Sequence, residues 1–237
     1  MFVGRVAEIP RESPVVMRAE TVLILANGVW ASPERLRRVV AAADHIIAAD
    51  GGYSKALAHG VHVDEVIGDL DSIPGAERKA LAEAAGPVVH AFARDKDWTD
   101  LELALEHALR RDPSRIILFG VLGGRLDHAL TGVHLLEKGI EASVPILLVA
   151  GDETARLVER EAILRDVEPG DRVSLIPFSD SALVTTDGLR YPLRNEKLRR
   201  AASRGVSNEV ARIPVRIIVE AGLLFVVHAP KEGGSDG

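Results

Sequence analysis

The stretch VDEVIGDLDS, residues 63–72, carries three aspartates, of which Asp69 and Asp71 lie just beyond the strand-like run Val63 to Ile67. Residues 63–67 are typical of a buried strand that ends in a loop, and from that loop both carboxylates can turn toward one divalent ion. Carboxylates and water suit hard cations, and Mg²⁺ is usually held by one or two carboxylates together with phosphate oxygens. An Asp-x-Asp pair alone is also typical of surface loops, so the rest of the chain decides its meaning.

Around this stretch, strand-like and helical segments alternate. Short apolar runs that end in turn residues predict strands at residues 21–26, 45–49, 63–67, 88–92, 116–119 and 144–149. Helical spacing of apolar residues predicts a helix that starts at Ser32 and further helices at 53–60, 76–85, 99–111 and 126–138, the last stopping at Gly139. This alternation predicts an α/β domain with a parallel, doubly wound sheet over residues 21–150.

The pattern changes after Gly151. Short β-like runs predict strands at residues 155–164, 172–177, 182–186, 216–220 and 223–228, without convincing helices. We therefore predict a small all-β, sandwich-like domain over residues 151–230. Residues 1–20 are predicted to be an N-terminal extension, either loosely ordered or the result of a start codon placed before Met17. Residues 231–237, rich in glycine and charge, are predicted to be a disordered tail.

Composition narrows the possible partners and compartments. The 237 residues are 47% apolar, enough for a sizeable core, and carry a net charge of −6 with lysine and arginine scattered along the chain. Nucleic-acid binding requires a concentrated basic face, so we expect no nucleic-acid partner. No apolar run is long enough to span a membrane, the first 20 residues do not resemble a secretory signal, and the chain has no cysteine. We predict a globular protein of the reducing cytoplasm, without a membrane partner.

Polar or glycine-rich loops follow the predicted strands, and in a doubly wound sheet ligands bind beyond the carboxyl ends of the strands. These loops hold Asn27-Gly28, Asp50-Gly51-Gly52, Asp69 and Asp71, Asp95-Lys96-Asp97, and Gly123-Gly124-Arg125. The aspartates among them would repel one another unless cations lie between them. Two of the acidic residues have simpler explanations: Asp50 suits a turn, and Asp100 suits the first turn of the helix that Thr99 caps.

The glycine pairs allow close backbone approach to phosphates, and the Arg125 guanidinium can bind their oxygens. The sequence has no Walker A motif, no G-x-G-x-x-G, no G-x-S-x-G nucleophile elbow and no H-E-x-x-H. His128 suits either a structural place in a helix or a catalytic one. A magnesium-dependent enzyme that handles nucleotide phosphates is the function that remains.

Four motifs, in this order and at this spacing, resemble the thiamine pyrophosphokinase family. They are Asp50-Gly51-Gly52, Gly68-Asp69-Leu70-Asp71-Ser72, Asp95-Lys96-Asp97-Trp98-Thr99-Asp100 and Gly123-Gly124-Arg125-Leu126-Asp127-His128. Two later motifs, Gly188-Leu189-Arg190-Tyr191-Pro192-Leu193 and Val206-Ser207-Asn208-Glu209, extend the resemblance to about His228. One expected feature is missing: animal members carry a late tryptophan that stacks on thiamine, whereas both tryptophans here precede residue 100. Tyr191 is a possible replacement.

The resemblance implies transfer of a diphosphate from ATP to the hydroxyl of thiamine, which yields thiamine diphosphate and AMP. It implies a nucleotide-binding α/β domain, a thiamine-binding β-sandwich, and a homodimer with active sites between subunits. It implies Mg²⁺ ligands at Asp69, Asp71 and Asp100, and catalytic roles for Asp71, Asp97, Asp100 and Asp127. The ATP and thiamine sites would include Asn27, Asp50, Gly51, Gly52, Thr99, Gly124, Arg125, Asp127, Ser207 and Asn208.

Two alternatives stay open on the sequence. A diphosphokinase for another hydroxymethyl compound, such as a pterin, would share the Gly-Asp-x-Asp-Ser core. The β domain with Ser207-Asn208 favours thiamine. A non-catalytic sensor of nucleotide or thiamine would have no need of the acidic residues Asp69, Asp71 and Asp100.

Overall fold

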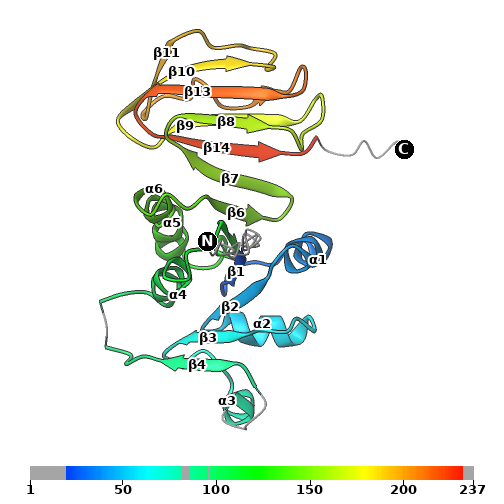
Figure 1. Ribbon diagram of the computed structural model, residues 1–237, viewed down its shortest axis with the longest axis vertical. Coiled ribbons are helices and arrows are strands. Elements are labelled where there is room, and N and C mark those ends of the chain that lie inside the picture. Colours follow the sequence, from blue (N-terminus) through cyan, green and yellow to red (C-terminus); the bar gives the residue numbers. More distant parts are fainter. Residues whose placement is uncertain (1–19, 82–85, 96, 232–237) are drawn as a thin grey trace, which may run out of the picture.

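The computed structural model describes residues 20–81, 86–95 and 97–231, which form two β-sheets and six helices (Figure 1). A ten-stranded mixed sheet runs through the molecule, and a four-stranded antiparallel sheet packs on one end of it. Except for Glu20 and Lys231, the predicted N-terminal extension and C-terminal tail lie outside the described residues. Within those residues no helix is long and apolar enough to cross a membrane.

Six parallel strands form one part of the large sheet, in the order β6-β5-β1-β2-β3-β4. They are β1 Thr21–Leu25, β2 His45–Ala49, β3 Glu65–Gly68, β4 Val88–Ala91, β5 Arg115–Phe119 and β6 Ile146–Ala150. All of β1, and all but the first residue of β2 and β5, is buried. Their continuous apolar sequence is typical of strands covered on both faces.

Helices cover both faces of this parallel part (Figure 1). They are α1 Pro33–Ala41, α2 Gly52–Ala58, α3 Gly75–Leu81, α4 Asp100–Leu109, α5 Leu126–His134 and α6 Glu137–Glu141. Buried residues of α1, α2 and α3 share one core with the sheet, while those of α4 and the segment after α5 share the core on the other face. The observed architecture confirms the predicted doubly wound α/β fold.

The chain reverses its direction of travel across the sheet at β1. From β1 it moves through β2 and β3 to β4, then returns to place β5 on the other side of β1. In doubly wound sheets, the crevice beyond the carboxyl ends of the strands at such a switch point is where ligands bind.

The large sheet continues past β6 with antiparallel strands, because β7 pairs antiparallel with β6. The added strands, in the order β12-β9-β14-β7, are β12 Asn208–Glu209, β9 Arg172–Pro177, β14 Leu224–Ala229 and β7 Glu153–Val158. Opposite them lies the second sheet, in the order β11-β10-β13-β8, with β11 Glu196–Arg199, β10 Ser181–Asp187, β13 Val215–Ala221 and β8 Glu161–Leu164. A separate core between the two sheets confirms the predicted sandwich-like part. The domain boundary at residue 150 stays a prediction.

Three details of the predicted elements are wrong. The expected helix 126–138 is two helices, α5 and α6. Gly139 does not end a helix but lies inside α6. Glycine is required there for packing, because a side chain would meet the Val144 carbonyl oxygen and Ile146 Cγ1, both at 2.6 Å. The expected strand 155–164 is divided at two exposed residues, Glu159 and Arg160, so that β7 and β8 join different sheets.

The strands β11 and β12 were not predicted. One contains a single buried residue, Leu198, and the other is only two residues long, so neither carries an apolar pattern. The last part of the predicted helix 76–85, residues 82–85, lies outside the described residues.

Candidate active site

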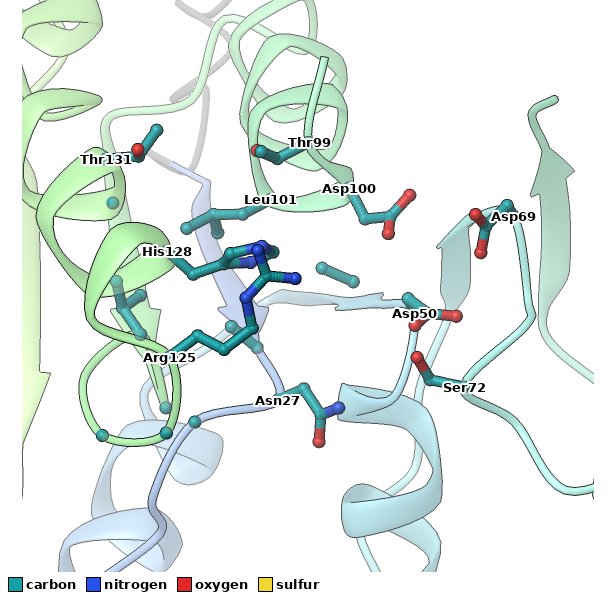
Figure 2. Close-up of a pocket in the computed structure, with 18 of the residues that line it drawn as sticks. Asn27, Asp50, Asp69, Ser72, Thr99, Asp100, Leu101, Arg125, His128 and Thr131 are labelled. Atoms are coloured by element: carbon teal, nitrogen blue, oxygen red, sulfur yellow. The ribbon is translucent and has the colours of Figure 1, made fainter. Parts of the chain in front are cut away.

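A cleft of about 500 Å³ opens at the switch point, beyond the carboxyl ends of the parallel strands (Figure 2). Loops after β1, β2, β3 and β5 line it, together with the first turns of α4 and α5. Backbone hydrogen bonds join the loops after β1 and β5: the Gly28 amide donates to the Gly120 carbonyl at 2.6 Å, and Val29 donates to Leu122 at 2.8 Å. The cleft is therefore built on the sheet.

Asp50 follows β2 directly and is buried, with 7% of its surface exposed. Its backbone has φ of 42°, in the left-handed region, and its amide donates to the Ile67 carbonyl at 2.9 Å. Its Oδ1 is buried without a hydrogen-bond partner among the described residues. A buried, unpartnered carboxylate oxygen carries a desolvation cost unless a ligand or cation meets it, so Asp50 indicates a binding site.

Asp69 and Asp71 reach the same place from the loop after β3. Leu70 between them has φ of 62°, and the Asp71 amide donates to Asp69 Oδ1 at 3.1 Å. One carboxylate oxygen from each of Asp50, Asp69 and Asp71 lies within 4.8 Å of the others. Such an all-oxygen set suits a hard divalent cation, and the unpartnered Asp50 oxygen is consistent with one.

Asp100 is the first residue of α4 and lines the same cleft. Its Oδ1 and the Asp50 Cβ both lie about 3.0 Å from the point where a side chain at Gly68 would begin. Figure 2 shows Asp50, Asp69 and Asp100 grouped on one side of the cleft. The expected metal set of Asp69, Asp71 and Asp100 thus shares one cleft, with Asp50 as a fourth carboxylate.

The other side of the cleft carries Arg125 and His128 (Figure 2). The Arg125 guanidinium binds Asp127 with two hydrogen bonds, Nε to Oδ1 at 3.1 Å and Nη2 to Oδ2 at 2.6 Å. These bonds, with one from the His128 amide, lower the pKa of Asp127 to about 2. Asp127 is therefore ionised at neutral pH and fixes the orientation of the cation beside it.

The two glycine pairs differ in what fills the space of their missing side chains. A side chain at Gly51 would meet Asn27 Nδ2 at 2.4 Å, and one at Gly52 would meet the Leu25 carbonyl oxygen at 2.1 Å. Both glycines are buried, so this pair serves the packing of α2 against the end of β1. At Gly124, which lines the cleft, the space is open. Close approach of a ligand to the backbone suits Gly124.

Of the expected site residues, Asn27, Asp50, Asp69, Asp71, Thr99, Asp100, Gly124 and Arg125 line the cleft. Gly51, Gly52, Asp97, Asp127, Ser207 and Asn208 are not part of its lining. Asp97 is exposed on the loop before α4, and its neighbour Lys96 lies outside the described residues.

Ser207 and Asn208 lie in the second domain, where Asn208 is buried in β12. Its side chain accepts a hydrogen bond from the Tyr191 amide at 3.0 Å and donates one to the Tyr191 carbonyl at 2.7 Å. Asn208 thus fixes the loop that presents Tyr191, a residue that is 53% exposed. The roles predicted for all these residues stay predictions.

Sequence reasoning did not assign Ser72 or Thr131 to the site, and both line the cleft. Ser72 donates a hydrogen bond to Asp71 Oδ1 at 3.2 Å. It is the last residue of the Gly-Asp-Leu-Asp-Ser motif, so its place in that motif could have assigned it to the site. Thr131 follows His128 by three residues, so helical spacing places both on one side of α5.

The fold and the cleft define a class of protein: a two-domain α/β protein with a carboxylate-lined cleft at the switch point of a parallel sheet. Residues 36–148 match the family model "Thiamin pyrophosphokinase, catalytic domain", and residues 161–224 match "Thiamin pyrophosphokinase, vitamin B1 binding domain". A thiamine pyrophosphokinase of Bacillus subtilis is 32% identical over 194 residues, which cover 77% of this chain and 86% of that protein.

Solved structures agree with this match. The crystal structure of thiamine pyrophosphokinase from Bacillus subtilis matches this structure with a TM-score of 0.80 at 30% sequence identity. The match covers 90% of this chain and 100% of the Bacillus subtilis chain. The crystal structure of thiamin pyrophosphokinase from Geobacillus thermodenitrificans has a TM-score of 0.77 at 28% identity, with coverage of 91% and 99%. The chain therefore belongs to the thiamine pyrophosphokinase family. This confirms the resemblance and the predicted enzymatic function, the synthesis of thiamine diphosphate.

The substitution Gly52→Ala tests whether the first glycine pair is required for packing. We expect it to lower the free energy of unfolding by about 1–3 kcal/mol, because the new methyl group meets backbone that cannot move aside easily. The matched control is Gly75→Ala at the start of α3, where nothing lies within 4 Å of the added carbon. Urea unfolding of the two variants measures the difference, and equal midpoints would contradict the packing role.

Proposed function

We propose that the cleft at the switch point is where this chain transfers a diphosphate group from ATP to the hydroxyl of thiamine, releasing AMP. Family membership supports the reaction, and one structural observation carries the location. Four carboxylates meet in the cleft, those of Asp50, Asp69, Asp71 and Asp100. The buried oxygen Oδ1 of Asp50 lacks a hydrogen-bond partner among the described residues. A polyphosphate with its cations would meet that oxygen and neutralise the group.

We assign Mg²⁺ to Asp69, Asp71 and Asp100, with Asp50 as an additional ligand or orienting group. When bound there, the ion would screen the charge of the triphosphate and of the phosphoryl group in transfer. Arg125, oriented by Asp127, faces these carboxylates across the cleft and suits the phosphate oxygens. The open backbone at Gly124 suits close approach of the same phosphates.

The proton of the thiamine hydroxyl requires an acceptor. With a pKa of about 2, Asp127 is a weak base, so we assign it to the positioning of Arg125. Asp71 and Asp100 line the cleft, and the one whose carboxylate is not held by Mg²⁺ during the transfer is the candidate for the acceptor, whereas Asp97 stands outside the lining. Residues 151–230 would supply the thiamine site, with Ser207 and the loop that Asn208 fixes at Tyr191.

A cytoplasmic location is part of this proposal. ATP is abundant in that compartment, and a chain of 237 residues without cysteine is compatible with its reducing conditions.

Incubation of the purified chain with Mg²⁺, ATP and thiamine should produce AMP and thiamine diphosphate in equal amounts. Chelation of Mg²⁺ should stop the reaction, because the converging carboxylates would then repel the triphosphate. Chromatography of the nucleotides measures the outcome. Formation of ADP would mean transfer of a single phosphoryl group and would overturn the proposed reaction, and AMP formed with a pterin alcohol but not with thiamine would change the substrate.

The variant Asp71→Asn tests the acidic residues directly. We expect turnover to fall on the order of 10²-fold or more, because one preorganised ligand charge is lost at the transferring phosphate. Asp180→Asn is the matched control, since Asp180 is 92% exposed in the second domain and pairs with Arg200 at 2.7 Å. Steady-state rates of both variants give the comparison. Full activity of Asp71→Asn would remove Asp71 from the site.

We also propose that the active form is a homodimer. Leu126 and Leu130 lie one turn apart at the start of α5, beside Arg125, with exposed fractions of 73% and 56%. Two exposed leucines next to a cleft form an apolar surface that a second copy of the chain would cover.

The double variant Leu126→Asp, Leu130→Asp should be monomeric in light scattering, because charge would be buried in the contact. Leu57→Asp, on α2, places the same charge at a leucine that is 45% exposed and should leave the dimer intact. A double variant that stays dimeric would exclude α5 from the interface, and a monomeric wild type would exclude the dimer.

A further inference from the structure

A second cluster of titratable side chains surrounds Glu65, the first residue of β3, at the opposite end of the strands from the cleft. Glu65 is buried and lies on the face of the sheet that α4 covers. Three imidazoles meet its carboxylate: His45 from the start of β2, His90 from β4 and His107 from the last turns of α4. Side chains from three elements thus converge on the carboxylate of a fourth, β3.

The two oxygens of Glu65 have different partners. His90 Nε2 lies 2.6 Å and His107 Nε2 lies 2.8 Å from Oε2, and the two rings are 4.5 Å apart at their centroids. On the other oxygen, Oε1, His45 Nε2 lies at 2.6 Å and Arg111 Nη1 at 3.3 Å. One side of the carboxylate therefore faces only imidazole nitrogens, and the other side is held by His45 and a cation.

The Nε2 atoms of His90 and His107 both point at Oε2, with no other described residue between them and that oxygen. A metal ion bound there would replace the protons that now lie between these nitrogens and the carboxylate.

We propose that Glu65, His90 and His107 form a binding site for a divalent transition-metal ion such as Zn²⁺, separate from the catalytic cleft. The ligand atoms, Glu65 Oε2 and the two Nε2 atoms, lie within 4.8 Å of one another. Imidazole with one carboxylate and no thiolate is a donor set for Zn²⁺ rather than for Mg²⁺. A water molecule would complete four-coordination.

The present distances require a small movement. Zinc bonds of about 2.0–2.1 Å in a tetrahedron separate the ligand atoms by roughly 3.3 Å, so the rings would move outward from the carboxylate oxygen by roughly 0.5–0.7 Å. The side chains of His90 and His107 are 33% and 27% exposed, which leaves room for that movement and for entry of the ion.

The groups on Oε1 act as the supports that metal ligands commonly have. His45 and Arg111 fix the carboxylate without using Oε2, and Arg111 is itself held by Glu20 at 2.7 Å. His45 faces Oε1 through its Nε2 at 2.6 Å, so this nitrogen supports the carboxylate and is not offered to the metal. A bound ion would connect β3, β4 and α4.

The experiment is a calorimetric titration of the full chain with Zn²⁺, after removal of metals with a chelator and in an excess of Mg²⁺ that occupies the acidic cleft. We expect one Zn²⁺ per chain and a higher unfolding temperature with Zn²⁺ than without it. His90→Gln and His107→Gln should each weaken Zn²⁺ binding at least about tenfold, with circular dichroism showing that the variants remain folded.

Two controls separate this site from other sources of Zn²⁺ binding. His62→Gln removes an imidazole that is 87% exposed and outside the ligand set, and Asp71→Asn removes a carboxylate of the cleft; both should keep the same Zn²⁺ affinity. In the wild type, Co²⁺ should give the strong visible absorption of a tetrahedral site, and Zn²⁺ should abolish it. Absence of Zn²⁺ binding by the wild type would overturn the proposal and leave a hydrogen-bonded network only. Affinity for Zn²⁺ in His90→Gln and His107→Gln equal to that of the wild type would do the same.

Discussion

Mutual repulsion among carboxylates is the constraint on which the active-site end of this molecule depends. Oxygens of Asp50, Asp69 and Asp71 lie within 4.8 Å of one another, with Asp100 in the same cleft. Two unit charges at that distance repel by roughly 3 kcal/mol in surroundings of intermediate polarity, before water and salt screen them. Only a rigid support holds such a group together, and the buried strands β1, β2 and β3 provide it.

This support explains why much of the site could be predicted from sequence. A buried parallel strand is an apolar run, and its carboxyl end is marked by the first polar residue, so Asp50, Asp69 and Asp71 could be assigned to one edge. The place of Asp100 followed from Thr99, whose hydroxyl accepts from the Glu102 amide at 3.2 Å and fixes the start of α4. Local sequence patterns were sufficient to predict where a site residue lies when its position depends only on the strand or helix that carries it and on where that element begins or ends.

Prediction was insufficient where a contact joins distant parts of the chain. Gly51-Gly52 allows close backbone approach to a phosphate, but whether the missing side chain of Gly52 faces a ligand or Leu25 depends on how α2 docks. Asn208 contacts the backbone of Tyr191, 17 residues away, and no periodicity shows such a pair. The continuation of the large sheet from β6 into β7 was missed because strand pairing across a domain boundary leaves no local pattern.

The strands that hold the cleft carry charged groups at both ends. β2 runs from His45 to the residue before Asp50, and β3 runs from Glu65 to the residue before Asp69. α4 repeats the arrangement, since Asp100 at its first turn lines the cleft while His107, about 10 Å further along the helix, contacts Glu65. Apolar side chains of α4 already hold the helix on the sheet, and the contact between His107 and Glu65 adds a polar tie to β3. This tie lies at the end of α4 opposite Asp100, so the two ends of one packed helix belong to the two charged clusters.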